Sequence, residues 1–379
     1  MTAGAGHRRA AEAIAQAAAR HFPEAEVRCV DVLTYAPGRF HALYAWSYLL
    51  LVRHLPWIWQ VSYRLVDGWL GYRLNQPLRW RWNLAITRRF TAMLKAQPPD
   101  LIVTTHFLPA DVCSTAKRAG WLRVPLAVVI TDLHPHRFWM SREAEAVVVS
   151  TDEGRATLER RGIDPARIHV IGIPIGPAFS EPADRRAIGK RLGLDPGRLT
   201  VLVTSGGTTV GQFERVVRSL AALDREMPKR VQLLVVCGMD DAAKERLTQF
   251  VQRTAVPMCV FGFVSYMADL MAVSDLMVAK AGGLTVTEAL ARALPMVLYH
   301  VIPGQERLNA EYVARQGAAV IAPQPAQVIR AVRRCLEEPS RLEGMRRAAA
   351  SLAHPHAAEE IVCKVIEPLM KQTSCNVKR

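Results

Sequence analysis

The chain has 379 residues, half of them hydrophobic, and a formal net charge of +15. Its length argues against a single hydrophobic core, so two domains are expected, and its composition is that of ordinary folded domains. The seven scattered cysteines, never spaced as CxxC, argue against a zinc site or a disulfide framework and predict buried thiols in a reducing compartment.

The chain opens with a glycine turn and a strongly helical pattern, TAGAGHRRAAEAIAQAAARHF at residues 2–22. In an α/β domain such a turn normally follows a β-strand, and no strand-type run precedes it here. We therefore expect the first strand of this domain to be missing. The segment also lacks the pattern of a secretory signal, so we expect a cytoplasmic protein.

The segment 37–97 is basic and rich in tryptophan. It contains nine Lys and Arg residues, a single acid and six of the eight tryptophans. Its longest apolar run, 40–52, is shorter than the roughly 20 residues that a spanning helix needs. Tryptophan rings interspersed with Lys and Arg side chains favour docking on an anionic membrane surface. The candidate membrane residues are Trp46, Arg53, Trp57, Trp59 and Arg64.

Two alternatives remain for this segment. It could be a helical hairpin whose rings are ordinary core and whose arginines are solvated. Nucleic acid would also attract such charge. We favour the membrane, and we expect no nucleic-acid partner and no obligate protein partner.

From about residue 100 the sequence alternates short apolar runs with amphipathic segments, which is typical of parallel α/β units. We predict intervening helices at 110–119 and 153–161, and a Gly- and Pro-rich linker at 172–182. The predicted strands are 101–105, 126–131, 146–150 and 169–172 before the linker, and 200–204, 231–237, 258–261, 276–279, 296–299 and 319–322 after it.

Two glycine turns lie between a predicted strand and a predicted helix. AKAGGLTVTEALARALP, residues 279–295, places Gly282 and Gly283 ahead of a helix start, where unpaired N–H groups favour phosphate. Thr285 and Glu288 fit S/T-x-x-E, so a capping box that only finishes the helix is the alternative. TSGGTTVGQ, residues 204–212, is a second turn of this type. Together the two turns indicate one diphosphate held from two sides.

Longer motifs carry a family resemblance. AGGLTVTEALARALPMVLYHVIPGQERLNAEYVARQGAA at 281–319, SGG at 205–207 and FGFV at 261–264 resemble the donor half of family 28 glycosyltransferases. AGAGHRRAAEAI at 3–14 and TDLHPHRFWM at 131–140 resemble the acceptor half of its monogalactosyldiacylglycerol synthase and processive diacylglycerol glucosyltransferase branch. The GGLTVTEA piece is also similar to the peptidoglycan enzyme that adds N-acetylglucosamine to lipid I. That enzyme has a longer first turn, GGTGGH, which this chain lacks.

The resemblance implies the α/β GT-B fold, with two Rossmann-like domains whose parallel sheets face a central cleft. It implies an N-terminal lipid-acceptor and membrane-docking domain at 1–176 and a UDP-sugar-binding domain at 177–353. A helical tail at 354–379 would pack back on the first domain. The donor would be UDP-glucose or UDP-galactose, with inversion at the anomeric carbon. Since the chain has no DxD triplet, we expect no metal and no cofactor.

Carried over by position, the resemblance gives roles to donor-side residues. Glu288 would bind the ribose hydroxyls, and Phe263 would line the uracil pocket. Gln305 would hydrogen-bond the sugar, unless it only starts a helix, with Glu306 and Asn309 as further candidates. The remaining substrate-binding candidates are Gly6, Ser205, Gly206, Gly207, Lys280, Gly282, Gly283, Leu284 and Thr285.

On the acceptor side the resemblance places His7 near the acceptor hydroxyl, whose proton an imidazole can take up. A second cluster contains Asp132, His134 and His136. Asp132 could orient an imidazole, or His136 could itself be the base. A structural or solvated role is the alternative for each of these residues.

We therefore expect an inverting glycosyltransferase, peripheral on the inner face of the cell membrane. It would move a hexose from a UDP-sugar to the 3-hydroxyl of diacylglycerol. The nearest alternative is a UDP-N-acetylglucosamine transferase that acts on a polyprenyl-linked peptidoglycan precursor. An alternative of another class is a non-catalytic nucleotide- or lipid-binding protein.

Overall fold

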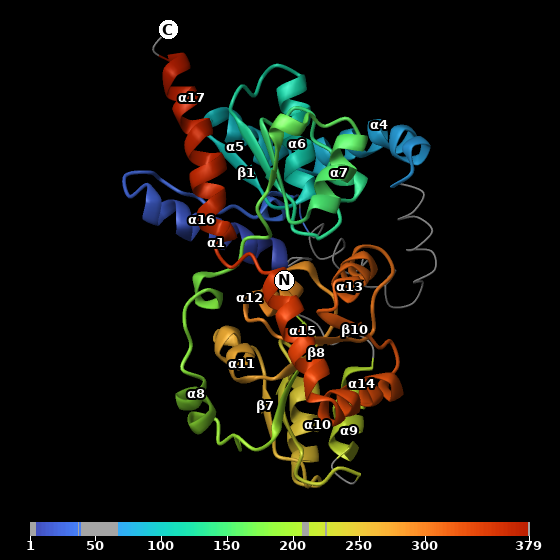
Figure 1. Ribbon diagram of the computed structural model, residues 1–379. Coiled ribbons are helices and arrows are strands. Elements are labelled where there is room, and N and C mark those ends of the chain that lie inside the picture. The colour runs from blue at the N-terminus through green and yellow to red at the C-terminus, as the bar shows by residue number, and fades with distance from the viewer. Residues whose placement is uncertain (1–4, 37, 39–66, 207–211, 224–225, 378–379) are drawn as a thin grey trace. The chain divides into compact units, whose positions relative to one another are not determined.

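The computed structural model describes residues 5–36, 38, 67–206, 212–223 and 226–377, and the chain divides into two compact units (Figure 1). Unit 1 comprises Met1–Gly176, Pro303–Gln305 and His356–Arg379. Unit 2 comprises Pro177–Ile302 and Glu306–Pro355. The predicted membrane residues Trp46, Arg53, Trp57, Trp59 and Arg64, and the predicted phosphate contact Gly207, lie outside the described residues.

Unit 1 is built on a parallel sheet whose described strands are ordered β1-β2-β3-β4. Its register pairs Ile102 with Leu126, Ala127 with Ala146 and Val147 with Ile168. The strands are β1 (Ile102–Thr104), β2 (Leu126–Val129), β3 (Ala146–Val149) and β4 (Ile168–Val170). All four strands predicted before the linker are therefore confirmed, with ends that differ by one or two residues.

Alternate residues of these strands face opposite sides of the sheet, as the two-residue period of a strand requires. Leu126 and Val128 of β2 join one core cluster, while Ala127 and Val129 join another. The first face is covered by α5 (Arg88–Ala96), α6 (Phe107–Arg118) and the 3-10 helices η1 (Val32–Tyr35) and η2 (Arg137–Trp139), with α4 (Trp69–Ile86) against α6. Helix α7 (Asp152–Arg160) connects β3 to β4.

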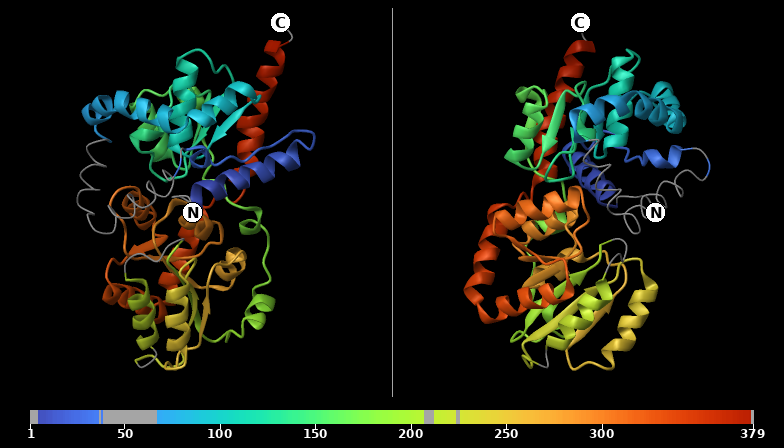
Figure 2. Two further views of the ribbon diagram at one scale, coloured as in Figure 1. Left: turned by 180° about the vertical axis from the view of Figure 1, so that it is seen from behind. Right: turned by 90° about the vertical axis from the view of Figure 1, so that its right-hand side faces the viewer.

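The second face of this sheet is covered by the two ends of the chain. Helix α1 (Ala5–His21) buries its alanine stripe there beside α16 (Ala357–Ile361) and the π-helical turn Val362–Ile366, which continues into α17 (Glu367–Val377). Figures 1 and 2 show the C-terminal helices beside α1. Arg20 and His21 of α1 pair with Glu359 and Glu367 at 2.9 and 3.1 Å. The C-terminal helices are thus part of the core of unit 1.

The described strands of unit 2 form a parallel sheet of six strands with the order β10-β9-β8-β5-β6-β7. The strands are β5 (Leu199–Thr204), β6 (Val231–Val236), β7 (Met258–Phe261), β8 (Leu276–Ala279), β9 (Met296–Leu298) and β10 (Ala319–Ile321). They confirm all six strands predicted after the linker. The order of connection reverses between β5 and β8, and in sheets of this kind ligands bind beside that reversal, at the carboxyl ends of the strands.

Helices surround this sheet on both faces (Figure 2). They are α8 (Arg185–Arg191), α9 (Phe213–Ala222), α10 (Asp241–Val251), α11 (Met267–Val273), α12 (Gly283–Ala291), α13 (Gln305–Arg315, in unit 2 from Glu306), α14 (Pro325–Glu337) and α15 (Pro339–Ser351). The residues of the inner strands β9, β8, β5 and β6 are almost all buried, as expected for a sheet covered on both sides, whereas the edge strands β7 and β10 are only partly buried.

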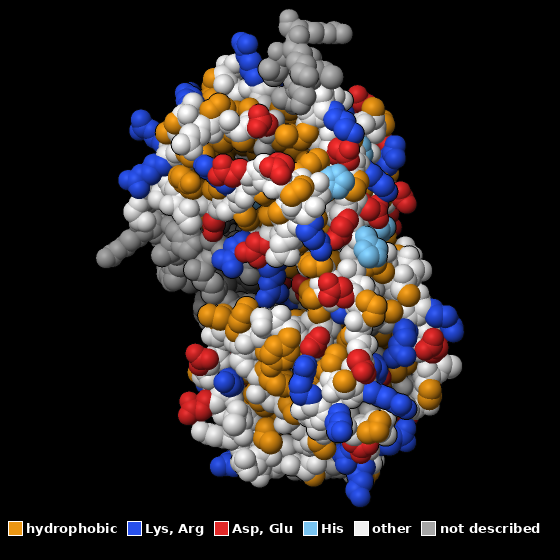
Figure 3. Space-filling model, turned by 90° about the vertical axis from the view of Figure 1, so that its left-hand side faces the viewer, with side chains coloured by type: hydrophobic (Ala, Val, Ile, Leu, Met, Phe, Trp, Pro, Cys, Tyr) orange, Lys and Arg blue, Asp and Glu red, His pale blue; other side chains and the backbone are white. Residues whose placement is uncertain are grey.

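The surface can be compared with the sequence in its charge distribution and in the exposure of its cysteines. On the face shown in Figure 3, basic and acidic side chains are interspersed. Cys29 and Cys363 are exposed, so the prediction that the cysteines are buried is wrong for these two. Among the described residues, every helix is too short or too polar to span a bilayer.

Candidate active site

The two predicted phosphate turns of unit 2 follow neighbouring strands. β5 and β8 pair directly, with Val203 opposite Val278, so the turns that leave them start side by side. A Cβ placed on Gly206 would lie 3.6 Å from Cε of Lys280, and Gly206 has a φ of +76°, which favours glycine. The structure thus brings Gly206 and Lys280 together where the strand order reverses.

Helix α12 begins at the second turn without a side-chain cap. Its N-cap is Gly282, whose lack of a side chain leaves no capping hydrogen bond, and Thr285 and Glu288 are its third and sixth residues. The capping-box alternative is therefore wrong, because a capping box needs its Thr at the N-cap. Thr287, not Thr285, bonds back along the helix, from Oγ1 to the Gly283 carbonyl at 2.9 Å. The first N–H groups of α12 are left uncapped by side chains, which favours an anion.

Lys280 and Glu306 lie close enough beside this turn for the charge of each to shift the pKa of the other, and we call them the charged pair of unit 2. Burial lowers the pKa of Lys280, and the nearby Glu306 carboxylate opposes that shift. Burial raises the pKa of Glu306, opposed by Lys280 and by a 3.4 Å hydrogen bond from the Ile302 N–H. Each residue thus favours the charged form of the other, at a position from which water is partly excluded. A cation so placed can attract a phosphate with little competition from water.

The other donor-side candidates have separate places in the fold. Glu288 is 4% exposed in α12, and Asn309 is fully buried, with Nδ2 donating to the Ala281 carbonyl at 3.2 Å. Asn309 therefore fixes the backbone of the second turn. Phe263 follows β7 and is 62% exposed. Gln305 begins α13, and Leu284 is the second residue of α12.

In unit 1, His7 lies in the first turn of α1, directly after Gly6. Thr105 contacts both its ring and its backbone, and Thr131 contacts its ring. Its Nδ1 lies 3.0 Å from the Thr105 carbonyl oxygen and 2.6 Å from Oγ1 of Thr131. Oγ1 of Thr105 in turn donates to the His7 carbonyl at 2.8 Å. Both threonines follow strand ends, β1 and β2. The ring and backbone of His7 are therefore fixed at the carboxyl edge of the sheet.

The contact with the Thr105 carbonyl indicates which ring nitrogen of His7 carries the proton. Since a carbonyl oxygen can only accept, we assign the proton to Nδ1, and Nε2 then carries the lone pair of the neutral ring. Burial lowers the pKa of His7 to about 4, although the bond to Thr105 acts in the opposite direction. At neutral pH the ring is thus an uncharged acceptor, as a general base must be.

A second histidine that we did not predict lies beside the first. The ring centroids of His106 and His7 are 4.6 Å apart and the rings are perpendicular. An aromatic cluster continues from them through Phe107, Phe138 and Trp139, with centroid separations of 4.2 to 6.2 Å. His106 follows β1 within TTHF, so a search for polar residues at strand ends would have found it together with Thr105 and Thr131.

The residues of the predicted second cluster have structural partners of their own in unit 1. Asp132 is buried and accepts from Nε1 of Trp139 at 3.4 Å. His136 is buried, its Nδ1 caps η2 by accepting from the Phe138 N–H at 3.2 Å, and its Nε2 lies 3.7 Å from Asp67. Burial is the largest cause that lowers the pKa of His134. The groups that orient His7 are Thr105 and Thr131.

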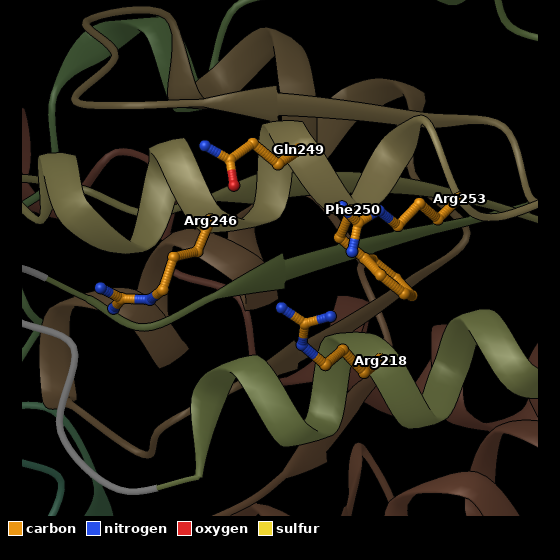
Figure 4. A pocket seen from close by; sticks show the side chains of 5 residues that line it. All are labelled: Arg218, Arg246, Gln249, Phe250 and Arg253. Carbon is orange, nitrogen blue, oxygen red and sulfur yellow. The ribbon is translucent and has the colours of Figure 1, made fainter.

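A small hollow of about 100 Å³ lies elsewhere on unit 2, between α9 and α10 (Figure 4). Arg218 from α9 stacks on Phe250 of α10, with 4.5 Å from Cζ to the ring centroid. Arg246 pairs with Glu214 at 2.7 Å. These groups are engaged with one another, so the hollow is a helix packing feature. Within the described ranges no cluster of His, Cys, Asp or Glu could hold a metal ion.

Known families match both halves of the chain. Residues 7–175 match the model of monogalactosyldiacylglycerol (MGDG) synthase, and residues 200–361 match the glycosyltransferase family 28 C-terminal domain. The two matched ranges contain the His7 site and the paired glycine turns, respectively.

Curated relatives and a solved structure agree with these matches. A processive diacylglycerol β-glucosyltransferase of Bacillus cytotoxicus is 30% identical over 76% of this chain and 72% of its own length. Monogalactosyldiacylglycerol synthase 1 of Arabidopsis thaliana is 30% identical over 98% of this chain and 70% of its own length. MurG of Acinetobacter baumannii, at 19% identity, superposes with a TM-score of 0.57 over 75% of this chain and 78% of that one, which supports the GT-B fold. The predicted fold class is confirmed, and the chain belongs to the diacylglycerol glycosyltransferases of family 28, together with the processive glucosyltransferases and MGDG synthase.

Proposed function

We propose that this glycosyltransferase moves a hexose from UDP-glucose or UDP-galactose to the 3-hydroxyl of diacylglycerol. The observation that carries the proposal is the state of His7 in the acceptor unit. It is neutral, oriented through Nδ1 and set against an aromatic cluster that suits an apolar acceptor. The names of the curated relatives supply the acceptor and the choice of hexose.

In the proposed reaction the acceptor hydroxyl gives its proton to Nε2 of His7 as its oxygen attacks the anomeric carbon. The bond from that carbon to the diphosphate oxygen breaks, and UDP leaves with the electron pair. Attack from the opposite face inverts the configuration. His7 serves better as the base than His136, because His136 caps η2 and faces Asp67.

The donor is held by unit 2 in this proposal. The N–H groups at the start of α12 and the turn at Ser205–Gly206 contact the diphosphate, and Lys280 offsets the charge that develops on the leaving UDP. Glu288 binds the ribose hydroxyls and Phe263 lines the uracil site, while Gln305, which belongs to unit 1, contacts the sugar. The reaction so arranged needs no metal and no cofactor.

We further propose that unit 1 docks on the cytoplasmic face of an anionic membrane. Leu74, Leu78 and Trp82 recur every four residues on α4 and are 73, 70 and 57% exposed. They form one apolar stripe, defined here as the α4 stripe. The exposed residues Arg73, Arg81, Arg88 and Arg89 lie along the same segment, and no acidic residue occurs between Asp67 and Asp100. An apolar stripe bordered by cations is complementary to an anionic bilayer.

The experiment that tests the proposal offers the full chain two lipids in separate vesicles, diacylglycerol and a polyprenyl-diphosphate acceptor. Each is assayed with radiolabelled UDP-glucose, UDP-galactose and UDP-N-acetylglucosamine. We expect label in a monohexosyl diacylglycerol. Transfer only of N-acetylglucosamine to the polyprenyl lipid would contradict the acceptor assignment. Absence of transfer in every combination would contradict the proposed function as a whole.

A further inference from the structure

The described histidines at the carboxyl edge of the unit 1 sheet include a pair with complementary hydrogen-bonding states. His7 presents an unprotonated Nε2, as argued above. His106 is the N-cap of α6, and its Nδ1 accepts from the Leu108 N–H at 3.1 Å. A ring nitrogen that accepts carries no proton, so the neutral ring of His106 is protonated at Nε2. One imidazole is therefore an acceptor and its neighbour a donor.

We propose that Nε2–H of His106 donates a hydrogen bond to the oxygen of the acceptor hydroxyl that His7 deprotonates. This inference rests on the proposed function, which it extends by a second substrate-contacting residue. The ring centroids, 4.6 Å apart, are close enough for one oxygen atom to contact both rings. His106 thus positions the nucleophile and His7 takes its proton.

The contact has a chemical consequence during transfer. The hydroxyl proton moves to Nε2 of His7, the oxygen forms its bond to the anomeric carbon, and the bond to UDP breaks. While negative charge develops on the oxygen, a donor from His106 stabilises it. His106 keeps its own proton throughout. Burial and the nearby His7 hold the pKa of His106 well below its usual value, so the pair does not carry two positive charges.

Capping alone does not explain a histidine at this position. Ser, Thr, Asp and Asn are the preferred N-caps, and any of them would satisfy the Leu108 N–H. A histidine adds a second ring nitrogen that the cap does not use, on a ring whose centroid lies 4.6 Å from that of His7. The nearby Phe107 ring, 4.2 Å from that of His106 between centroids, keeps the imidazole in place.

Two substitutions separate the cap from the donor. In His106→Asn the side-chain oxygen can replace Nδ1 as the cap, but no group reaches the position of Nε2. In His106→Gln the amide nitrogen can reach that position, but the cap is lost. We expect His106→Asn to keep the melting temperature and the UDP affinity while kcat/KM for diacylglycerol falls at least about tenfold. We expect His106→Gln to lower the melting temperature and to retain more activity than His106→Asn.

A substrate analogue locates the contact. A diacylglycerol analogue with hydrogen in place of the 3-hydroxyl lacks the proposed partner of His106, so we expect it to inhibit the wild type and His106→Asn with the same Ki. If the unaltered chain transfers hexose and His106→Asn equals it in kcat/KM, the inference fails while the proposed function stands. The inference also fails if activity follows the melting temperature in both variants, or if the Ki changes with the substitution. If the unaltered chain transfers no hexose to diacylglycerol, the proposed function itself fails.

Discussion

The candidate sites of the two units occupy equivalent positions in their sheets, but one is built mainly from side chains and the other mainly from backbone groups. Both lie at the carboxyl edge of a parallel sheet. In unit 1 the site consists of side chains that hold one another, with Thr105 and Thr131 fixing His7. In unit 2 it consists mainly of glycine turns and the uncapped start of α12, with one cation, Lys280.

This difference corresponds to two chemical tasks. A proton acceptor needs one defined nitrogen in one protonation state, which fixed side chains provide by burial and directed hydrogen bonds. A diphosphate presents many equivalent oxygens, which several backbone N–H groups can contact without a particular side chain. Substitutions in unit 1 should therefore affect turnover, whereas substitutions in unit 2 should affect nucleotide affinity.

The largest effect is expected for His7→Ala. Removing the proposed general base should lower kcat by about a hundredfold to ten thousandfold. UDP affinity should not change, because the nucleotide is assigned to unit 2. Steady-state kinetics and calorimetric titration with UDP measure the two quantities.

The matched control for this substitution is His21→Ala, which removes a histidine from the exposed end of the same helix together with its 3.1 Å contact to Glu367. It should keep full turnover. If His7→Ala keeps its turnover, or loses turnover and UDP affinity in parallel, the division of tasks between the units is wrong.

The same difference explains what the sequence could predict. The ten strands that the structure describes after residue 100 are predictable because buried parallel strands leave continuous apolar runs such as Val231–Val236, and the glycine turns are predictable because they are contiguous motifs. The partners of His7 are about 100 residues away in the chain, so only the fold brings Thr105, His106 and Thr131 to it. The capping-box alternative failed because the S/T-x-x-E pattern does not fix where a helix begins.

The pH dependence of activity is the second prediction. Because burial lowers the pKa of His7 to about 4, the ring stays neutral and able to accept a proton until the pH approaches that value. We expect kcat/KM to stay level from about pH 8 to about pH 5.5 and then to fall as the pH decreases, by up to tenfold per pH unit below about 4. Brief assays in stopped-flow mixing limit acid unfolding. A midpoint near 6.5 would show that the base is an ordinary, hydrated histidine.

The charged pair of unit 2 gives the third prediction. Lys280→Met should weaken UDP binding by about 10- to 150-fold, since a charge-assisted contact to phosphate contributes about 1.5 to 3 kcal/mol. It should also lower stability, because the partly buried Glu306 loses the cation that favours its charged form.

A double substitution separates these two effects. Lys280→Met combined with Glu306→Gln removes both charges and should recover much of the stability in urea unfolding. UDP affinity should remain low. If UDP affinity returns together with stability, Lys280 is only a structural partner of Glu306 and does not contact phosphate.

The smallest effect is expected at the α4 stripe, because a membrane contact is spread over many groups. Leu78 is 70% exposed, so Leu78→Ser should leave folding unchanged and remove roughly 1 kcal/mol of apolar burial in the interface, about a fivefold loss of vesicle binding. Co-sedimentation with anionic vesicles at several salt concentrations measures this loss. Met239 of unit 2 is 64% exposed, so Met239→Ser is the matched control and should bind vesicles like the wild type. If both substitutions weaken binding equally, the stripe has no special role. If neither does, and binding still falls with salt, the positive charge of the segment alone holds the protein on the membrane.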